Sequence, residues 1–140
     1  TDIFVDIRQM DASLNRWARA THRDMEARLK LVEQAKKTGA TEYAHEVIAW
    51  FLDAQWPFKG PKPDIYYDPR TAEEGIYASL HAKCLVVDDR RALITSANFT
   101  DRGQTRNIEA GVLIEGGFAM KLVKQWRRLV DAEFVEQYRG

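Results

Sequence analysis

The chain is poor in cysteine and has no long apolar run. Its 140 residues include one cysteine, Cys84, so no disulfide can form within the chain, and such sparing use fits the reducing cytoplasm. The longest apolar run, VIAWFL at residues 47–52, is far shorter than the roughly 20 residues that cross a membrane. No signal peptide, lipidation motif or low-complexity tract is present. The sequence therefore predicts a cytoplasmic protein without a membrane span.

The chain also lacks a net charge, because 21 lysines and arginines balance 21 aspartates and glutamates. A neutral balance argues against strong non-specific binding to nucleic acid, although a local basic patch remains compatible with it. The sequence contains no carboxylate cluster and no set of histidines and cysteines at metal-ligand spacing. We therefore expect neither a metal ion nor another cofactor.

Hydrophobic residues, by contrast, make up 45% of the chain, which is enough to build a core. Apolar residues at alternating positions predict strands, and apolar residues at three- and four-residue steps predict helices. The expected strands are residues 2–8, 64–70, 77–87, 92–96 and 108–115. The expected helices are residues 14–38, capped by Asp11 or Ser13, then 42–52 and 118–134. This mixture predicts an α/β fold in which a mixed β-sheet is flanked by helices on both faces.

The length of the chain suits one domain, residues 1–140, or one half of a larger two-part protein. Thr1 is not an initiator methionine, and it stands at the very start of a strand-like run. We therefore expect the chain to be a piece of a longer protein, which an N-terminal portion would precede.

The stretch LHAKCLVVDDRRALITSANFT, residues 80–100, holds the side chains best suited to chemistry. His81 and Lys83 are two residues apart, so on a strand both side chains point the same way. An imidazole can act as a nucleophile or proton carrier near neutral pH, and an ammonium can stabilise charge on phosphate oxygens. The pair alone also fits a half-exposed strand. Four further polar residues favour a phosphodiester site instead: Asp88, Ser96, Asn98 and Glu109.

The spacing of these residues resembles the HKD signature of the phospholipase D superfamily. The pattern is His81-x-Lys83, four residues, Asp88, six residues, and then Thr-Ser-x-Asn at residues 95–98. Residues 106–111, RNIEAG, supply the acidic position that is common downstream of the signature. Thr95 departs from the pattern, because the family usually has glycine before the serine. Within the superfamily, the region is similar to the phospholipase-D-like component of DISARM-type bacterial anti-phage systems.

The resemblance implies a metal-independent reaction in which His81 attacks a phosphodiester and becomes a transient phosphohistidine. It implies that Lys83 and Asn98 hold the phosphate, with help from the Ser96 hydroxyl. It also implies that Glu109 bonds His81 and keeps the imidazole in its reactive tautomer.

The site of this superfamily needs two such motifs, and the chain has one. His22 and His45 each lack a lysine two residues later, so neither fits as the second histidine. The resemblance implies that a homodimer mate, or a missing N-terminal half, supplies the histidine that protonates the leaving oxygen; we expect the homodimer first. Asp88 closes the motif at a turn, where we expect it to fix the loop rather than touch substrate.

Neither the fold nor the motif selects the phosphodiester. Lipid enzymes of this type usually need a membrane segment or an apolar rim, and neither is evident in the sequence. The first expectation is therefore a nuclease acting on DNA or RNA, with subunits of a defence complex as further partners. The alternatives are a lipid-acting phospholipase D-type enzyme and a non-catalytic assembly subunit that retains the fold.

Overall fold

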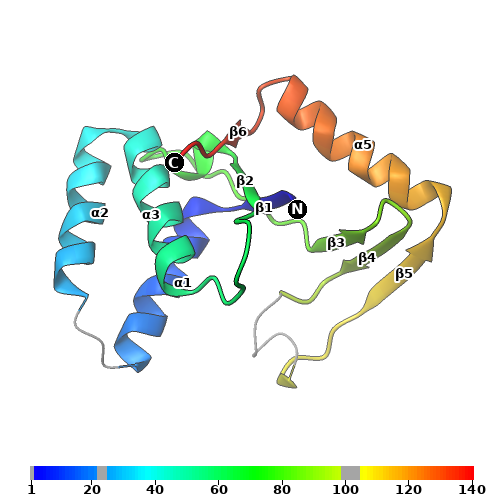
Figure 1. Ribbon diagram of the computed structural model, residues 1–140, viewed down its shortest axis with the longest axis horizontal. Coiled ribbons are helices and arrows are strands. Elements are labelled where there is room, and N and C mark those ends of the chain that lie inside the picture. Colours follow the sequence, from blue (N-terminus) through cyan, green and yellow to red (C-terminus); the bar gives the residue numbers. More distant parts are fainter. Residues whose placement is uncertain (1, 22–24, 99–104) are drawn as a thin grey trace. The chain divides into compact units, whose positions relative to one another are not determined.

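The computed structural model describes residues 2–21, 25–98 and 105–140 (Figure 1). Helices and strands both occur within these ranges, so the predicted α/β class is confirmed. No helix in the described ranges is long and apolar enough to cross a membrane.

Two compact units make up the chain. Residues 1–80 and 133–140 form the first, which we call the N-terminal unit, and residues 81–132 form the second, which we call the motif unit. Every candidate site residue belongs to the motif unit. The strands of each unit pair only within that unit and form a three-stranded sheet. The described strands form two separate sheets, and the sheet of the N-terminal unit is a mixed one, as expected.

The sheet of the N-terminal unit contains one parallel and one antiparallel pair. Strand β1 (Asp2–Val5) pairs in parallel with β2 (Asp64–Tyr67), and β6 (Glu136–Gln137) pairs with β2 in the antiparallel sense. Parallel neighbours need a long crossover connection. The crossover consists of the helices α1 (Ile7–Ala20), α2 (Glu26–Thr38) and α3 (Ala40–Ala54).

The single helix expected at residues 14–38 is wrong, because α1 ends at Ala20 and α2 begins at Glu26. At the end of α1, the Thr21 hydroxyl donates to the Trp17 carbonyl at 2.9 Å. The Thr21 backbone N–H donates to the same carbonyl at 3.0 Å, so both groups of Thr21 close the last turn of α1.

Polar groups fix the start and the packing of α1. Its cap is Asp6, whose carboxylate accepts the Gln9 N–H at 3.0 Å, and not Asp11 or Ser13 as expected. Asp11 lies inside the helix and is buried, where it accepts the Tyr43 hydroxyl at 2.8 Å. This buried bond joins α1 to α3.

The core of the N-terminal unit lies among these three helices and β2. Burial of each large apolar side chain contributes about 1.5–3 kcal/mol. The largest fully buried apolar side chains are Trp50, Tyr67, Ile7, Leu14, Ile48, Ile65, Val32 and Val47.

The motif unit is an antiparallel sheet followed by one helix. Strands β3 (Cys84–Val87), β4 (Arg91–Thr95) and β5 (Gly111–Glu115) pair in chain order, and α5 (Gly117–Asp131) packs against β4 and β5. Between β3 and β4, Asp88 and Asp89 both have φ of 52°. Aspartate tolerates this left-handed conformation better than most residues do. The turn expected at Asp88 is therefore present.

The strand expected at residues 77–87 is shorter in the structure, because β3 begins at Cys84. The ladder extends by one bond, from the Thr95 N–H to the Lys83 carbonyl at 3.0 Å. Strand β4 ends at Thr95, so the residues before Lys83 have no strand opposite them on β4. His81 and Lys83 therefore lie just outside the strand that was expected to carry them.

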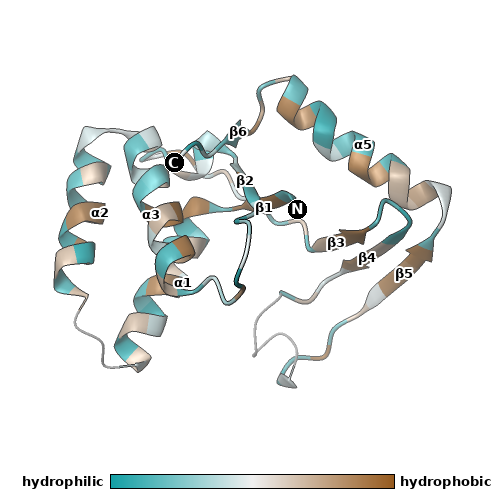
Figure 2. Ribbon diagram, in the orientation of Figure 1, coloured by the Kyte–Doolittle hydropathy of each residue, from teal (hydrophilic) through white to brown (hydrophobic). Residues whose placement is uncertain are grey.

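The two faces of the motif sheet differ in how far their side chains are buried. Along β3, Cys84 and Val86 are half-buried, whereas Leu85 and Val87, which alternate with them, are exposed. Trp126 of α5 bonds the Cys84 thiol, and burial, the larger effect, raises the pKa of that thiol. The Cys84 face is therefore the one that α5 covers. Figure 2 shows hydrophobic residues in both β3 and α5.

Candidate active site

A buried carboxylate of the N-terminal unit holds Leu80, the residue at which this stretch of the unit ends. Besides capping α1, Asp6 accepts the backbone N–H of Leu80 through its second oxygen, at 3.0 Å. Leu80 is the residue directly before His81. Sequence reasoning missed this role, because 74 positions separate the two partners. The signal available was an aspartate directly before a helix, which only pointed to a cap.

His81 is exposed, and its side chain makes no hydrogen bond or ion pair with any residue that the structure describes. Lys83 is half-buried, and its ammonium donates to the backbone carbonyl of His81 at 2.9 Å. The Lys83 side chain therefore turns back toward residue 81. The imidazole stays open to a ligand, and a cation lies beside its own backbone.

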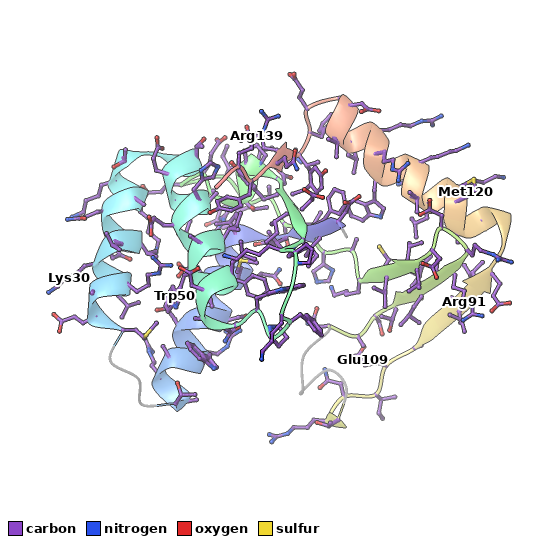
Figure 3. All side chains as sticks on the ribbon, in the orientation of Figure 1. Lys30, Trp50, Arg91, Glu109, Met120 and Arg139 are labelled. Carbon is purple, nitrogen blue, oxygen red and sulfur yellow. The ribbon has the colours of Figure 1, made fainter. Side chains whose placement is uncertain are left out.

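Ser96 and Glu109 come together at the end of β4 and just before β5. The Ser96 hydroxyl donates to Glu109 Oε2 at 2.5 Å, and the Asn107 amide donates to Oε1 at 2.9 Å. The Ser96 oxygen accepts the Ala110 N–H at 3.1 Å. Both oxygens of the carboxylate thus have donors from the loop that joins β4 to β5. Figure 3 shows Glu109 at this end of the sheet and Arg91 at the other.

These contacts keep Glu109 ionised. The Ser96 hydroxyl, the Asn107 amide and the Lys83 charge, in that order, hold the pKa of Glu109 below its usual range. Backbone bonds from the Thr95 N–H to the Lys83 carbonyl and from the Ser96 N–H to the Ala110 carbonyl place Lys83 and Glu109 at the same end of the motif sheet. A cation, a hydroxyl and a carboxylate therefore gather at one end of the motif sheet.

The two remaining candidates, Asn98 and Asp88, are exposed. Asn98 is exposed on the loop two residues after Ser96. Asp88 is exposed in the β3–β4 turn, at the opposite end of the sheet from Ser96. In this structure the oxygens of Glu109 accept from Ser96 and Asn107, so its bond to His81 stays a prediction.

Thr95, the residue that departs from the family pattern, fits because a glycine faces it. Gly111 pairs with Thr95 across the sheet. A Cβ on Gly111 would lie 3.1 Å from the Thr95 Cβ and 3.0 Å from the Ile94 carbonyl oxygen. The Thr95 hydroxyl accepts the Ala97 N–H at 3.0 Å and so shapes the turn after Ser96. The space that the motif needs is thus provided on the opposite strand.

The described residues contain no group of three or more histidines, cysteines or carboxylates placed to hold a metal ion. The chemistry that the described site can supply rests on an exposed imidazole, an ammonium, a hydroxyl and an ionised carboxylate.

Comparison with known proteins identifies the family to which the chain belongs. The chain matches the family model described as "Cardiolipin synthase, PLD-like domain" over residues 11–132. It is also similar to the "DISARM protein DrmC" of Bacillus paralicheniformis, with 36% identity over 61 residues. That alignment covers 44% of this chain and 25% of the relative. No solved structure gives a significant match. Because the family match spans most of the chain and every candidate site residue, the chain belongs to the family of phospholipase-D-like domains.

Proposed function

We propose that the chain is a metal-independent phosphodiesterase that cleaves nucleic acid through a phosphohistidine on His81. The observation that carries this proposal is the group at the end of the motif sheet. There the Lys83 charge lowers the pKa of Glu109, the Lys83 ammonium donates to the His81 carbonyl, and the His81 imidazole forms no hydrogen bond with a described residue. A nucleophile beside a cation is what attack on a negatively charged phosphodiester requires.

In the proposed reaction, a ring nitrogen of His81 attacks phosphorus, and the bond from phosphorus to the leaving oxygen breaks. A second histidine gives its proton to that oxygen. Water then attacks the phosphohistidine, the phosphorus–nitrogen bond breaks, and the second histidine takes up a proton from the water. Lys83 and Asn98 hold the phosphate oxygens, and each proton-transfer role is worth about 10²–10⁴ in rate.

The second histidine comes from another phospholipase-D-like half, and a second copy of this chain is the first candidate. The uncovered face of the motif sheet supports such pairing. Leu85, Leu93 and Leu113 stand opposite one another across the three strands. Leu85 is 53% exposed and Leu113 is 67% exposed. An exposed apolar patch of this kind marks an interaction surface.

The likeness to the DISARM protein suggests the biological setting. We propose that this chain acts in the cytoplasm within an anti-phage defence system, alongside other subunits of that system. The alternatives are a lipid-acting enzyme of the phospholipase D type and an assembly subunit that keeps the fold without activity.

The deciding experiment offers purified protein four substrates in the presence of a chelator. The substrates are single-stranded DNA, double-stranded DNA, RNA and phosphatidylcholine vesicles. We expect cleavage of nucleic acid by the wild type and none by His81→Ala. The control is His22→Ala, because no lysine follows His22 two residues later. Turnover of lipid alone would favour the lipid enzyme, and equal cleavage by wild type and His81→Ala would favour the assembly subunit.

A further inference from the structure

The solvent face of α5 is basic along most of its length. Lys121, Lys124, Arg127 and Arg128 are all exposed, and no acidic residue precedes Asp131 in this helix. An α-helix turns by about 100° per residue, so Lys121, Lys124 and Arg128 fall within about 60° of one another, and Arg127 flanks them. We call these four residues the α5 stripe.

The charges of the α5 stripe are not neutralised by neighbours. None of the four forms an ion pair with a residue that the structure describes, whereas Arg91 of β4 pairs with Glu115 at 3.2 Å. The stripe also belongs to the more basic unit. The motif unit has nine basic and six acidic residues, and the N-terminal unit has twelve and fifteen. The zero net charge of the chain therefore conceals a positive motif unit.

Most of the apolar face of α5 beyond its first turn is packed, which favours one of two kinds of anionic partner. Ala119 is fully buried and Trp126 is half-buried against Cys84. A helix that binds in a membrane interface must insert its apolar face among the lipids. Because α5 packs on β4 and β5, its exposed large apolar side chains are limited to Phe118 (52%) and Met120 (46%) in its first turn. The cations dominate the solvent face along the rest of the helix.

The dimensions of the α5 stripe suit a sugar-phosphate backbone. From Lys121 to Arg128 the helix rises by about 10.5 Å. One strand of a duplex has a phosphate about every 3.4 Å along the axis, so the stripe spans about three phosphates. We propose that the α5 stripe binds the backbone of the nucleic-acid substrate without reading its sequence. The identity of this ligand rests on the proposed function.

The test measures binding of a labelled oligonucleotide, single-stranded and as its duplex, by fluorescence anisotropy over a salt series. All proteins carry His81→Ala, so that the oligonucleotide stays intact. Lys121→Gln/Lys124→Gln/Arg128→Gln should reduce the slope of log K against log salt by about 2–3 and weaken binding roughly 100-fold at about 0.1 M salt. The single change Arg128→Gln should reduce the slope by about 0.7–0.9.

The matched control removes three exposed cations from the N-terminal unit, as Lys37→Gln/Lys59→Gln/Arg139→Gln. The control triple should leave the slope unchanged, and the charge-preserving Lys121→Arg/Lys124→Arg should do the same. Equal losses in the α5 triple and the control triple would overturn the inference, because net charge alone would then explain binding.

A second arm uses vesicles that contain phosphatidylglycerol. If the α5 triple loses vesicle binding and keeps oligonucleotide binding, the stripe serves an anionic lipid surface and the inference is wrong. Cleavage assays with His81 restored separate this inference from the proposed function. Wild type that binds through the stripe and cleaves nothing contradicts only the function. Cleavage combined with unchanged binding by the α5 triple contradicts only the inference.

Discussion

At the scale of single residues, the Ser96 hydroxyl has its proton directed at Glu109 and its oxygen bonded to the Ala110 N–H. A hydroxyl so engaged can donate to a phosphate only by giving up the carboxylate. In the resting site Ser96 therefore acts on Glu109, and it fixes both the position and the charge of that group. The resemblance to the family implied instead that the Ser96 hydroxyl helps to hold the phosphate directly.

Ser96→Ala should raise the pKa of Glu109 toward the ordinary value of about 4.3, because the Ser96 hydrogen bond is the largest cause of the lowered pKa. In the wild type the lowered pKa means that the contacts of Glu109 contribute fully at neutral pH and are lost as pH falls through it. Carbon-13 NMR of the side-chain carboxyl measures the titration. Asn107→Ala should raise the pKa less, and an unchanged midpoint in Ser96→Ala would contradict this origin of the shift.

Lys83→Ala should lower kcat by about 10²–10³, the usual cost of removing one donor that stabilises transition-state charge. The side chain is only half-buried and its hydrogen bond is to an exposed carbonyl, so the melting temperature should change little. Steady-state kinetics and thermal unfolding measure the two effects. Lys59→Ala, an exposed lysine of the N-terminal unit, is the control. If Lys83→Ala unfolds the protein instead, Lys83 supports the fold and not the reaction.

At the scale of elements, one carboxylate joins the start of α1 to the chain segment that enters the motif. Asp6 is 9% exposed, and its two oxygens accept the N–H groups of Gln9 and Leu80. An N-cap is worth about 1 kcal/mol, and a buried N–H left without a partner costs about 1–3 kcal/mol. Asp6 thus serves two elements that are distant in the sequence.

Asp6→Ser should keep the cap of α1, because serine is a good N-cap residue, and lose the bond to Leu80. Asp6→Ala should lose both and be less stable than Asp6→Ser by about 1 kcal/mol. Urea unfolding measures the stabilities, and amide hydrogen exchange at Leu80 measures the lost bond. Fast exchange at Leu80 in both variants, with slow exchange in the wild type, is the expected pattern. Unchanged exchange in Asp6→Ser would show that Asp6 does not hold Leu80.

Gly111→Ala should destabilise the motif unit, because the new Cβ would lie 3.0 Å from the backbone oxygen of Ile94. Over-packing of this kind costs about 1–3 kcal/mol. Gly117→Ala is the matched control, because a Cβ there meets nothing within 4 Å. Thermal unfolding compares the two. Equal stabilities would show that β4 moves aside at little cost.

The sequence predicted the α/β class, the phospholipase-D-like family and the turn at Asp88, because each depends on local spacing. It did not predict where β3 begins. An extended pattern at residues 77–87 does not reveal that β4 ends at Thr95 and leaves the earlier residues unpaired. It also missed the contacts that hold the site, from Asp6 to Leu80 and from Gly111 to Thr95, because these partners meet only after folding.

At the scale of the whole molecule, the proposed reaction needs two histidines, and this chain supplies one in an HKD motif. If two copies share a site, each active site requires His81 from both. A mixed pair of wild type and His81→Ala then has an incomplete site. The number of chains in the active species can therefore be measured by mixing the wild type with an inactive variant.

Exchange of wild type with increasing amounts of His81→Ala should lower activity in proportion to the square of the wild-type fraction. Sedimentation should show a dimer under the same conditions. Dilution with buffer at concentrations where the dimer persists is the control, and there activity should fall linearly with protein. A linear loss in the mixtures, or a strict monomer, would contradict the shared site and point to an N-terminal half as the source of the second histidine.

The glycine opposite Thr95 has an evolutionary consequence. Threonine at position 95 adds a second close contact at this crossing, so homologues with threonine at position 95 should keep glycine at position 111. Glycine at position 95 would remove only that contact, because the Ile94 carbonyl oxygen would still lie 3.0 Å from a Cβ at position 111. A search pattern that insists on glycine before the serine would then pass over true members of the family, this chain among them.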